Sequence, residues 1–446
     1  MTRPPHPPHS NAVPTPPATA QVETASEVNE TWLRKLGPGL ITGAADDDPS
    51  GIATYSQAGA QFGFGMLWSL FLTYPLMVGI QLISARIGRV SGHGLATNIR
   101  RHYPKPVLVF IVGLLLIANT INIAADIAAM GEAGRLVAGG NAHWYSIGFG
   151  MASLLLQIFI PYNRYVRVLK WLTLGLLAYV ATVFVIGVPW LQVARATVLP
   201  ALSMKPDYIT TMVAVFGTTI SPYLFFWQAS QEVEEQHGIA LEKPLKYAPE
   251  QVARNYRRMK IDTVIGMGFS NFVAFCIMLT TAVTLNAHGI SDIQTSAQAA
   301  VALRPIAGQF AFLLFSLGII GTGLLAVPVL AGSAAYAMAG AFHWDGSLER
   351  DFKTAPQFYT IIALSTAGGV VLGFVGLDPI KALFWSAVLN GVISVPIMAV
   401  MMAMAVKPAI MGELRISRRL QWMGWICTGV MAVAVAAMFW AMRHGG

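Results

Sequence analysis

Cysteine and charged residues are both scarce in this chain. Cys accounts for 2 of its 446 residues, and Asp, Glu, Lys and Arg together make up only 11%. Cys276 and Cys427 lie in apolar segments and are too few for a disulfide framework or a zinc site. The sequence also lacks HExxH and GxSxG motifs and any Ser/Lys or Cys/His arrangement, which argues against a membrane enzyme.

Apolar residues, in contrast, make up 55% of the chain and gather in long runs. Runs of this length can cross about 30 Å of hydrocarbon, so we expect an all-α polytopic protein in a lipid bilayer. The pattern predicts eleven spans, at residues 38–60, 64–87, 106–137, 143–160, 166–189, 207–233, 260–286, 308–338, 357–376, 379–405 and 420–442.

The first 30 residues differ in composition from the rest. They are rich in Pro between Pro4 and Pro17, and they contain neither a hydrophobic face nor the apolar core of a signal peptide. We therefore expect a disordered cytoplasmic tail at residues 1–30 and a transmembrane domain at 31–442.

The distribution of Lys and Arg predicts the orientation of the spans. If the N-terminus is inside, 23 of the 29 Lys and Arg residues fall in segments on the inner side. We expect the protein to lie in the cell (inner) membrane. The positive-inside rule then places its N-terminus in the cytoplasm and its C-terminus on the outer side. The same distribution explains the net charge of +8 without a nucleic-acid partner.

Polar residues and helix breakers interrupt the first span at Asp46-Asp47-Asp48-Pro49-Ser50-Gly51. Charge at membrane depth costs roughly 2.5–3.5 kcal/mol per residue on insertion scales. Pro removes a backbone donor, so the helix should break beside the carboxylates and expose carbonyl oxygens that could bind a cation. Interrupted helices of this kind are the usual substrate sites of secondary transporters.

The sixth span repeats this interruption at Thr218-Thr219-Ile220-Ser221-Pro222-Tyr223. Spans one and six are five apart and therefore run in opposite directions. This predicts two inverted five-helix repeats, about 36–190 and 206–406, with a site between them at mid-membrane and an accessory span at about 420–442.

The opening of the chain resembles the Nramp-type divalent-metal transporters. The matching residues are Gly37-Pro38-Gly39, Asp48-Pro49, Gln57-Ala58-Gly59-Ala60, Leu67-Trp68, Gln81, Ser84-Ala85 and Gly88. The resemblance covers most of residues 34–440 and implies a LeuT-like fold. It also implies import of a divalent metal cation by alternating access, with the metal as substrate and no cofactor.

The sequence departs from the family pattern at both interruptions. The family's Asp-Pro-Gly-Asn reads Asp48-Pro49-Ser50-Gly51, and its Ala-x-x-Met-Pro-His ends here in Ser221-Pro222-Tyr223. Loss of the soft Met thioether leaves an all-oxygen site that suits a hard cation. The pattern is similar to the Nramp-related magnesium-transporter branch, which implies Mg²⁺ as substrate and Mn²⁺ as a second one.

The resemblance implies a metal-ligand set. Its members are Asp48, Gly51, Thr218, Ser221 and Ala45. Alternative roles exist for three of them. Asp48 could cap the second half-helix, and the hydroxyls of Thr218 and Ser221 could bond back to their own helix.

Other polar residues are candidates for a second shell or for the ion pathway. They are Asp46, Asp47, Tyr223, Gln228, Asp126, Asn122, Asn271 and Asn390. For Asp46 and Asp47 we expect a solvated vestibule wall, and for Glu232, Glu234 and Glu235 a solvated acidic face. Interhelical hydrogen bonding is the alternative for the Asn residues.

Most of the family's titratable relay is absent. Ala129 stands where the family's third span has Glu, and Tyr223 and Gln228 stand at two family His positions. We therefore expect a monomeric uniporter driven by the membrane potential. One alternative is a proton-coupled Mn²⁺/Fe²⁺ symporter. Another is a LeuT-like carrier of a small organic solute, but the three Asp residues would repel the carboxylate of such a solute.

Overall fold

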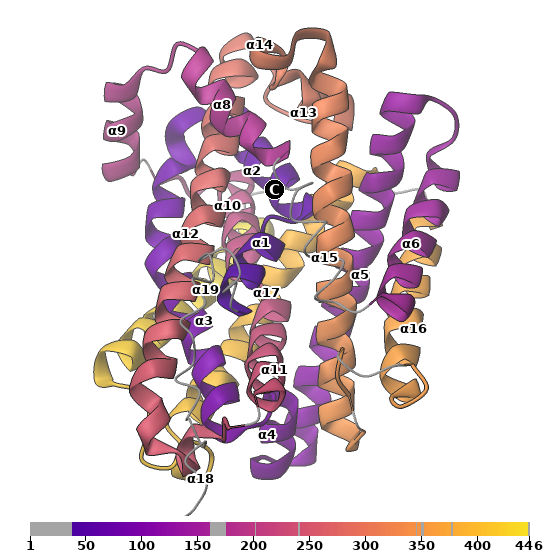
Figure 1. Ribbon diagram of the computed structural model, residues 1–446. Coiled ribbons are helices and arrows are strands. Elements are labelled where there is room, and N and C mark those ends of the chain that lie inside the picture. The colour runs from indigo at the N-terminus through magenta and orange to yellow at the C-terminus, as the bar shows by residue number, and fades with distance from the viewer. Residues whose placement is uncertain are drawn as a thin grey trace, which may run out of the picture. The chain divides into compact units, whose positions relative to one another are not determined.

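The computed structural model describes residues 38–160, 175–200, 202–239, 241–344, 346–348, 352–375 and 378–444, all in one compact unit, Gly37–Gly446. The described ranges contain helices and no strand, which confirms the all-α prediction (Figure 1). The tail predicted at residues 1–30 lies outside them, as do residues 166–174 of the predicted fifth span.

Helices of the first half follow the predicted spans one to five. They are α1 (Pro38–Asp46), α2 (Pro49–Phe62), α3 (Leu67–Ser91), α4 (Leu95–His102), α5 (Lys105–Ala138), α6 (Ala142–Phe159), α8 (Leu177–Val185) and α9 (Trp190–Val198). The first span is broken between α1 and α2, where Pro49 occupies the first turn of α2 and cannot donate a backbone hydrogen bond.

Helices of the second half follow spans six to ten, and α19 forms the eleventh. They are α10 (Pro206–Thr219), α11 (Pro222–Gly238), α12 (Val252–Thr284), α13 (Ser296–Val301), α14 (Arg304–Ala307), α15 (Ala311–Phe342), α16 (Pro356–Leu372), α17 (Pro379–Ala405), α18 (Pro408–Met411) and α19 (Arg418–His444). The sixth span is broken between α10 and α11, and Pro222 again opens the second helix.

Helix contacts repeat between the two halves. α5 packs on its counterpart α15 and α3 on α12, while the contact of α2 with α12 is matched by that of α11 with α3. The pairs α5 with α6 and α15 with α16 correspond in the same way. This is the LeuT-like arrangement of two inverted five-helix repeats, with α19 added, that the sequence predicted.

Glycine contacts fix the helix that leads into each break. A Cβ built on Gly43 of α1 would lie 2.3 Å from the Gly266 carbonyl carbon of α12. A Cβ on Gly217 of α10 would lie 2.1 Å from the Ala387 carbonyl oxygen of α17. Only Gly permits these approaches, so both breaks are held in position by backbone contact.

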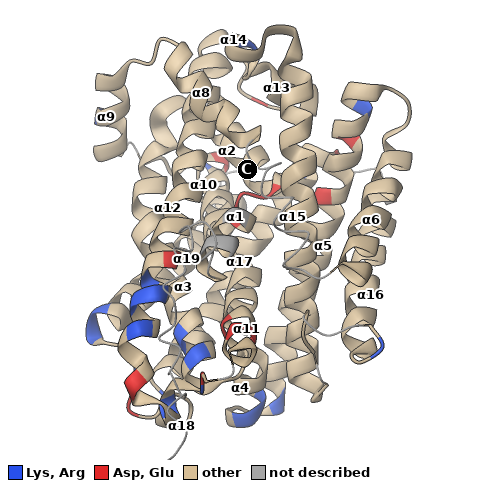
Figure 2. Cartoon of the chain, viewed as in Figure 1, with Lys and Arg blue, Asp and Glu red and all other residues tan. Residues whose placement is uncertain are grey.

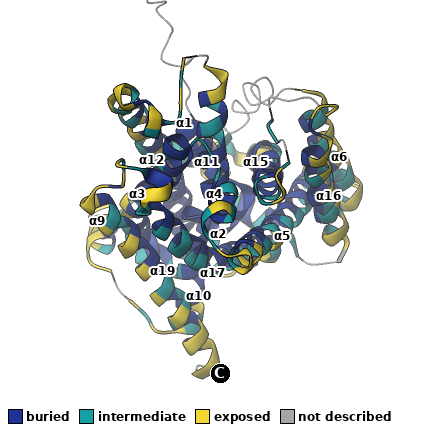
Figure 3. Cartoon of the chain, turned by 90° about the horizontal axis from the view of Figure 1, so that it is seen from below, coloured by how far each residue is buried: buried dark blue, intermediate teal, exposed yellow. Residues whose placement is uncertain are grey.

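The protein crosses the membrane several times. Within the described part of the chain, seven helical segments are long and apolar enough to do so, and α16 is a shorter apolar helix. Viewed from below, exposed residues lie around the rim and buried ones among α1, α11 and α12 (Figure 3). Lys and Arg gather at the end that carries α4 and α18, which we call the Arg-rich end (Figure 2).

Candidate metal centre

The break in the first span is stabilised by Asp48. Its Oδ1 accepts hydrogen bonds of 2.7 Å from the Gly51 backbone N–H and from Ser50 Oγ, so Asp48 is the N-cap of α2. An Asp cap satisfies an unpaired N–H of the first turn. The capping role weighed as an alternative for Asp48 is therefore present, and the carboxylate stays anchored at the helix start.

The break in the sixth span is stabilised by Ser221. Its hydroxyl oxygen lies 2.9 Å from the Gly217 carbonyl oxygen and 2.8 Å from that of Thr218, and its single hydrogen is donated toward this pair. The back-bonding expected as an alternative for Ser221 is thus observed. A donating hydroxyl keeps lone pairs on its oxygen, so it can still face a cation.

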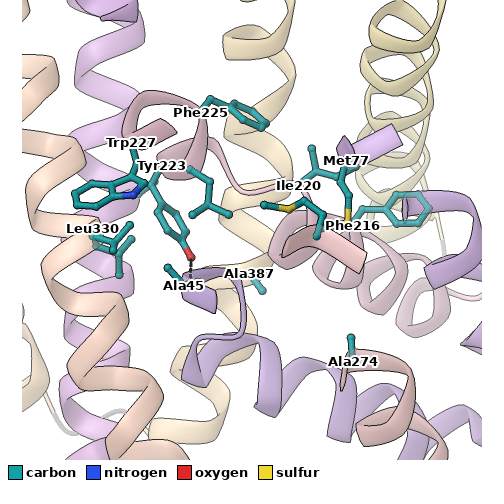
Figure 4. Close-up of a cluster of buried hydrophobic side chains, with 14 of the residues drawn as sticks. Ala45, Met77, Phe216, Ile220, Tyr223, Phe225, Trp227, Ala274, Leu330 and Ala387 are labelled. Atoms are coloured by element: carbon teal, nitrogen blue, oxygen red, sulfur yellow. Dashed lines mark hydrogen bonds between the residues drawn. The ribbon is translucent and has the colours of Figure 1, made fainter. Parts of the chain in front are cut away.

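The two breaks lie against each other. A Cβ on Gly51 would be 3.2 Å from Thr218 Oγ1, and this hydroxyl is buried without a hydrogen-bond partner among the described residues. Across the break, Tyr223 Oη donates to the Ala45 carbonyl at 3.1 Å (Figure 4). The structure therefore brings together all five predicted ligands, with Tyr223 beside them.

Asp46 and Asp47 do not form a solvated wall, and that expectation was wrong. They are 1% and 4% exposed, and Ser270 Oγ of α12 lies 2.6 Å from Asp46 Oδ2 and 3.0 Å from Asp47 Oδ1. A Ser hydroxyl has one hydrogen, so it can donate to only one of these carboxylates. Both are held on α12, next to the break.

Ser270 was missed by the sequence reasoning, which selected its neighbour Asn271. Asn271 is only partly buried and lines a shallow surface pocket with Phe71 and Phe272, both at least half exposed. One residue corresponds to a rotation of about 100° on a helix, which separates the two faces. Asn271 therefore does not reach the centre.

Polar residues of α5 behave differently from one another. Asn122 and Asn390 of α17 exchange hydrogen bonds of 2.9 and 3.2 Å, the interhelical role expected as an alternative. Asp126 is fully buried, and neither of its oxygens has a partner among the described residues. Its carboxylate is near enough to Asp48 and Tyr223 to interact with them electrostatically.

Two further candidates lie beyond this group on α11. Gln228 is fully buried and donates to Thr263 Oγ1 of α12 at 3.2 Å. Glu232 is also fully buried and Glu234 is 9% exposed, so the solvated acidic face predicted here was wrong for both.

Glu232 belongs instead to an ion-pair group that we call the Arg-rich network. Arg258 contacts Glu232 at 2.6 Å and Glu235 at 2.7 Å, while the buried Arg89 pairs with Glu235 and Glu242. The network joins α3, α11, α12 and the segment that follows α11.

Charge at the centre is not compensated in this way. We call Asp46, Asp47, Asp48 and Asp126 the central carboxylates. None of them forms an ion pair with a basic residue in the described ranges. Within the described ranges, no group of three His, Cys, Asp or Glu residues is placed to hold a metal by side chains alone. A cation here would need carbonyl, hydroxyl or water oxygens as well.

Fold and centre together define a multi-pass membrane transporter with two interrupted helices. Residues 39–441 match the family model described as Natural resistance-associated macrophage protein-like, Nramp. Because the match covers most of the sequence, the chain belongs to the Nramp family.

Solved structures confirm the fold. A manganese transporter of Eremococcus coleocola, in complex with an aromatic bis-isothiourea compound, is similar with a TM-score of 0.72 at 16% identity, over 92% of this chain and 88% of that one. A mutant of that manganese transporter gives 0.73 at 16% identity, over 94% and 88%. MhsT in complex with L-phenylalanine gives 0.61 at 13% identity, over 91% and 98%.

Proposed function

We propose that this protein imports divalent metal cations by alternating access, with Mg²⁺ as the main substrate and Mn²⁺ as a second one. The observation that supports this most directly is the set of central carboxylates without basic partners. Isolated buried charges are strongly unfavourable unless they are paired or coordinate a metal. A divalent cation supplies the missing positive charge, whereas an organic carboxylate would be repelled.

The chemistry of the oxygens favours a hard cation. The metal would be bound by the Asp48 carboxylate, by backbone oxygens of Ala45 and Thr218, and by water. Mg²⁺ binds proteins through one or two carboxylates and keeps several waters. Ser221 offers a hydroxyl where a family thioether would favour softer metals.

Transport in this proposal is not coupled to protons. Ala129 of α5 is buried and cannot titrate, and the buried Gln228 amide is bonded to Thr263. A potential of 100 mV contributes about 2.3 kcal/mol per elementary charge, or about 4.6 kcal/mol for a divalent ion. That is sufficient for accumulation by a uniporter.

Alternating access requires one end of a transporter to be closed while the other is open. At the Arg-rich end, Gln231 Nε2 of α11 donates to Tyr336 Oη of α15 at 3.1 Å, and Glu234 Oε1 accepts from the Leu348 N–H at 2.9 Å. These contacts hold α11 against α15 and against the segment that follows α15. We propose that the protein lies in the cell (inner) membrane with this end facing the cytoplasm. We also propose that the transporter acts as a monomer.

Liposomes containing the purified protein would test the function. Mg²⁺ and Mn²⁺ influx and internal pH would be recorded together for wild type, Asp48→Ser and Asp378→Ala. Ser retains N-cap ability but removes the charge, so transport by Asp48→Ser should fall by roughly 100-fold or more if the carboxylate binds the ion. Asp378 caps the surface end of α17 through the Ile380 N–H, and Asp378→Ala controls for a lost Asp cap.

Mg²⁺ influx without acidification, lost only in Asp48→Ser, supports the proposal. Mn²⁺ influx with acidification and no Mg²⁺ flux would replace it with the proton-coupled symporter. Equal activity of wild type and Asp48→Ser would exclude Asp48 as a ligand.

A further inference from the structure

A cavity of about 480 Å³ opens at the end of the molecule opposite the Arg-rich end. Its walls come from the C-terminal end of α2, the first turns of α10 and α17, the last turn of α19 and the segment after α12. None of the predicted ligands lines it, so this vestibule is separate from the metal centre.

Two helices connect the vestibule with the centre. α2 contributes Gln57 and Gln61 to the cavity and begins at the Asp48 cap, while α10 contributes Thr211 and ends near Thr218. The nine residues from Asp48 to Gln57 correspond to about 14 Å along a helix. The buried stretch of α2 between Asp48 and Gln57 therefore separates an ion in the vestibule from the centre.

Hydrogen-bonding groups face this space. Thr211 is only 1% exposed, lines the cavity, and its hydroxyl makes no hydrogen bond with any described residue. Gln57 accepts from the Ile293 N–H at 2.9 Å, which fixes the segment after α12 over the end of α2. Gln61 accepts from Gln57 Nε2 at 3.4 Å. Polar groups thus line part of the cavity, beside a larger apolar wall that includes Phe384, Trp385 and Met442.

Charge at the mouth is mainly negative. Asp207 of α10 and Asp292 of the segment after α12 line the cavity and are exposed, and Lys381 of α17 is the one basic residue among the lining residues in the described ranges. Carboxylates around a concave surface raise the local concentration of cations. A vestibule with this lining selects against anions before they reach the centre.

We infer that the vestibule is a first binding station, which receives the divalent cation with its hydration shell intact. This inference rests on the proposed function and adds where and in what form the ion first binds. Six waters occupy roughly 180 Å³ at their volume in the liquid, so a hydrated ion fits in the cavity. Asp207 and Asp292 attract the ion, and Thr211 bonds its waters. The ion loses waters of its hydration shell only when it reaches the centre at Asp48.

Transport kinetics in liposomes can test this station. Half-saturating Mg²⁺ and maximal rate would be measured for wild type, Asp207→Asn/Asp292→Asn, Thr211→Val and Lys381→Gln. The double variant should need roughly threefold to tenfold more Mg²⁺ at an unchanged maximal rate, with a smaller effect in high salt. Lys381→Gln should shift the half-saturating concentration in the opposite direction, and Thr211→Val, which preserves shape, should raise it about twofold.

Hexaamminecobalt(III) provides a second readout, because it is similar in size to hydrated Mg²⁺ and does not release its ligands. It should inhibit wild type competitively and inhibit the double variant less strongly. Unchanged half-saturation in both the double variant and Lys381→Gln, together with no inhibition by hexaamminecobalt(III), would overturn the station while leaving the proposed function intact. Absence of divalent-cation flux in wild type would instead overturn the proposed function.

Discussion

Two groups of carboxylates in this protein, each with fully buried members, have opposite electrostatic surroundings. In the Arg-rich network Glu232 and Glu235 are paired with Arg89 and Arg258, whereas the central carboxylates have no basic partner among the described residues. The two groups lie at different places in the bundle, the first at the Arg-rich end and the second near the helix breaks.

The comparison distinguishes carboxylates that stabilise the fold through ion pairs from carboxylates that are unpaired and can bind a substrate cation. A buried ion pair is stable only when its partners remain together. Unpaired carboxylates at membrane depth cost free energy in the empty protein, and a bound cation recovers it. The same residue type therefore serves structure at one end and transport at the centre.

The largest effect is expected when the paired group is broken. Arg89→Leu removes a guanidinium that is 1% exposed and bonded to the Glu232 carbonyl at 3.0 Å and to Asn255 Oδ1 at 2.8 Å. Loss of one partner of a buried pair typically costs about 3–5 kcal/mol. The apparent Tm in detergent should fall sharply, with or without Mg²⁺.

Arg135→Leu is the matched control for that change. Arg135 pairs with Glu132 at the surface of α5, and its side chain is 49% exposed. Exposed pairs contribute about 0–1 kcal/mol, so the Tm should hardly move. A similar loss in both variants would mean that burial of the Arg-rich network is not what stabilises it.

The same kind of substitution should have opposite effects in the two groups. Asp126→Asn removes a buried charge whose oxygens have no partner, so the metal-free Tm should rise by the equivalent of about 1–3 kcal/mol. Stabilisation by added Mg²⁺ should become smaller. Asp262 of α12 also pairs with Arg258 of the Arg-rich network, at 3.5 Å, so Asp262→Asn should weaken this contact and lower the Tm. A lower metal-free Tm for both variants would refute the distinction.

Local chemistry made the breaks predictable from the sequence. Pro49 and Pro222 each remove a backbone donor, and Asp48 and Ser221 are residues that cap or bond back to a helix end. These effects act within four residues, so the sequence contains all the information that they require. The inverted repeat followed, because two similar breaks lie five spans apart.

Burial and pairing were not predictable in this way. Asp46 and Asp47 are enclosed because α1 packs on α12 through Gly43, and Ser270 then lies beside them. Glu232 is buried because Arg258 approaches from another helix. Such contacts depend on how helices rotate about their axes, and a single sequence without an alignment does not fix that rotation.

The smallest expected effect concerns which cation the centre prefers. Ser221→Met would place a thioether where the hydroxyl now bonds to the carbonyls of Gly217 and Thr218. Loss of these bonds should cost about 1 kcal/mol. A soft ligand should shift the ratio of Mn²⁺ or Cd²⁺ flux to Mg²⁺ flux upward, because Mg²⁺ gains nothing from sulfur. Ser221→Leu has similar bulk without the sulfur and separates ligand softness from size. If both variants change the flux ratio equally, the size of the side chain at position 221 rather than the hardness of the oxygens determines selectivity. If only Ser221→Met does so, the central carboxylates attract any divalent cation and the residue at 221 decides among them.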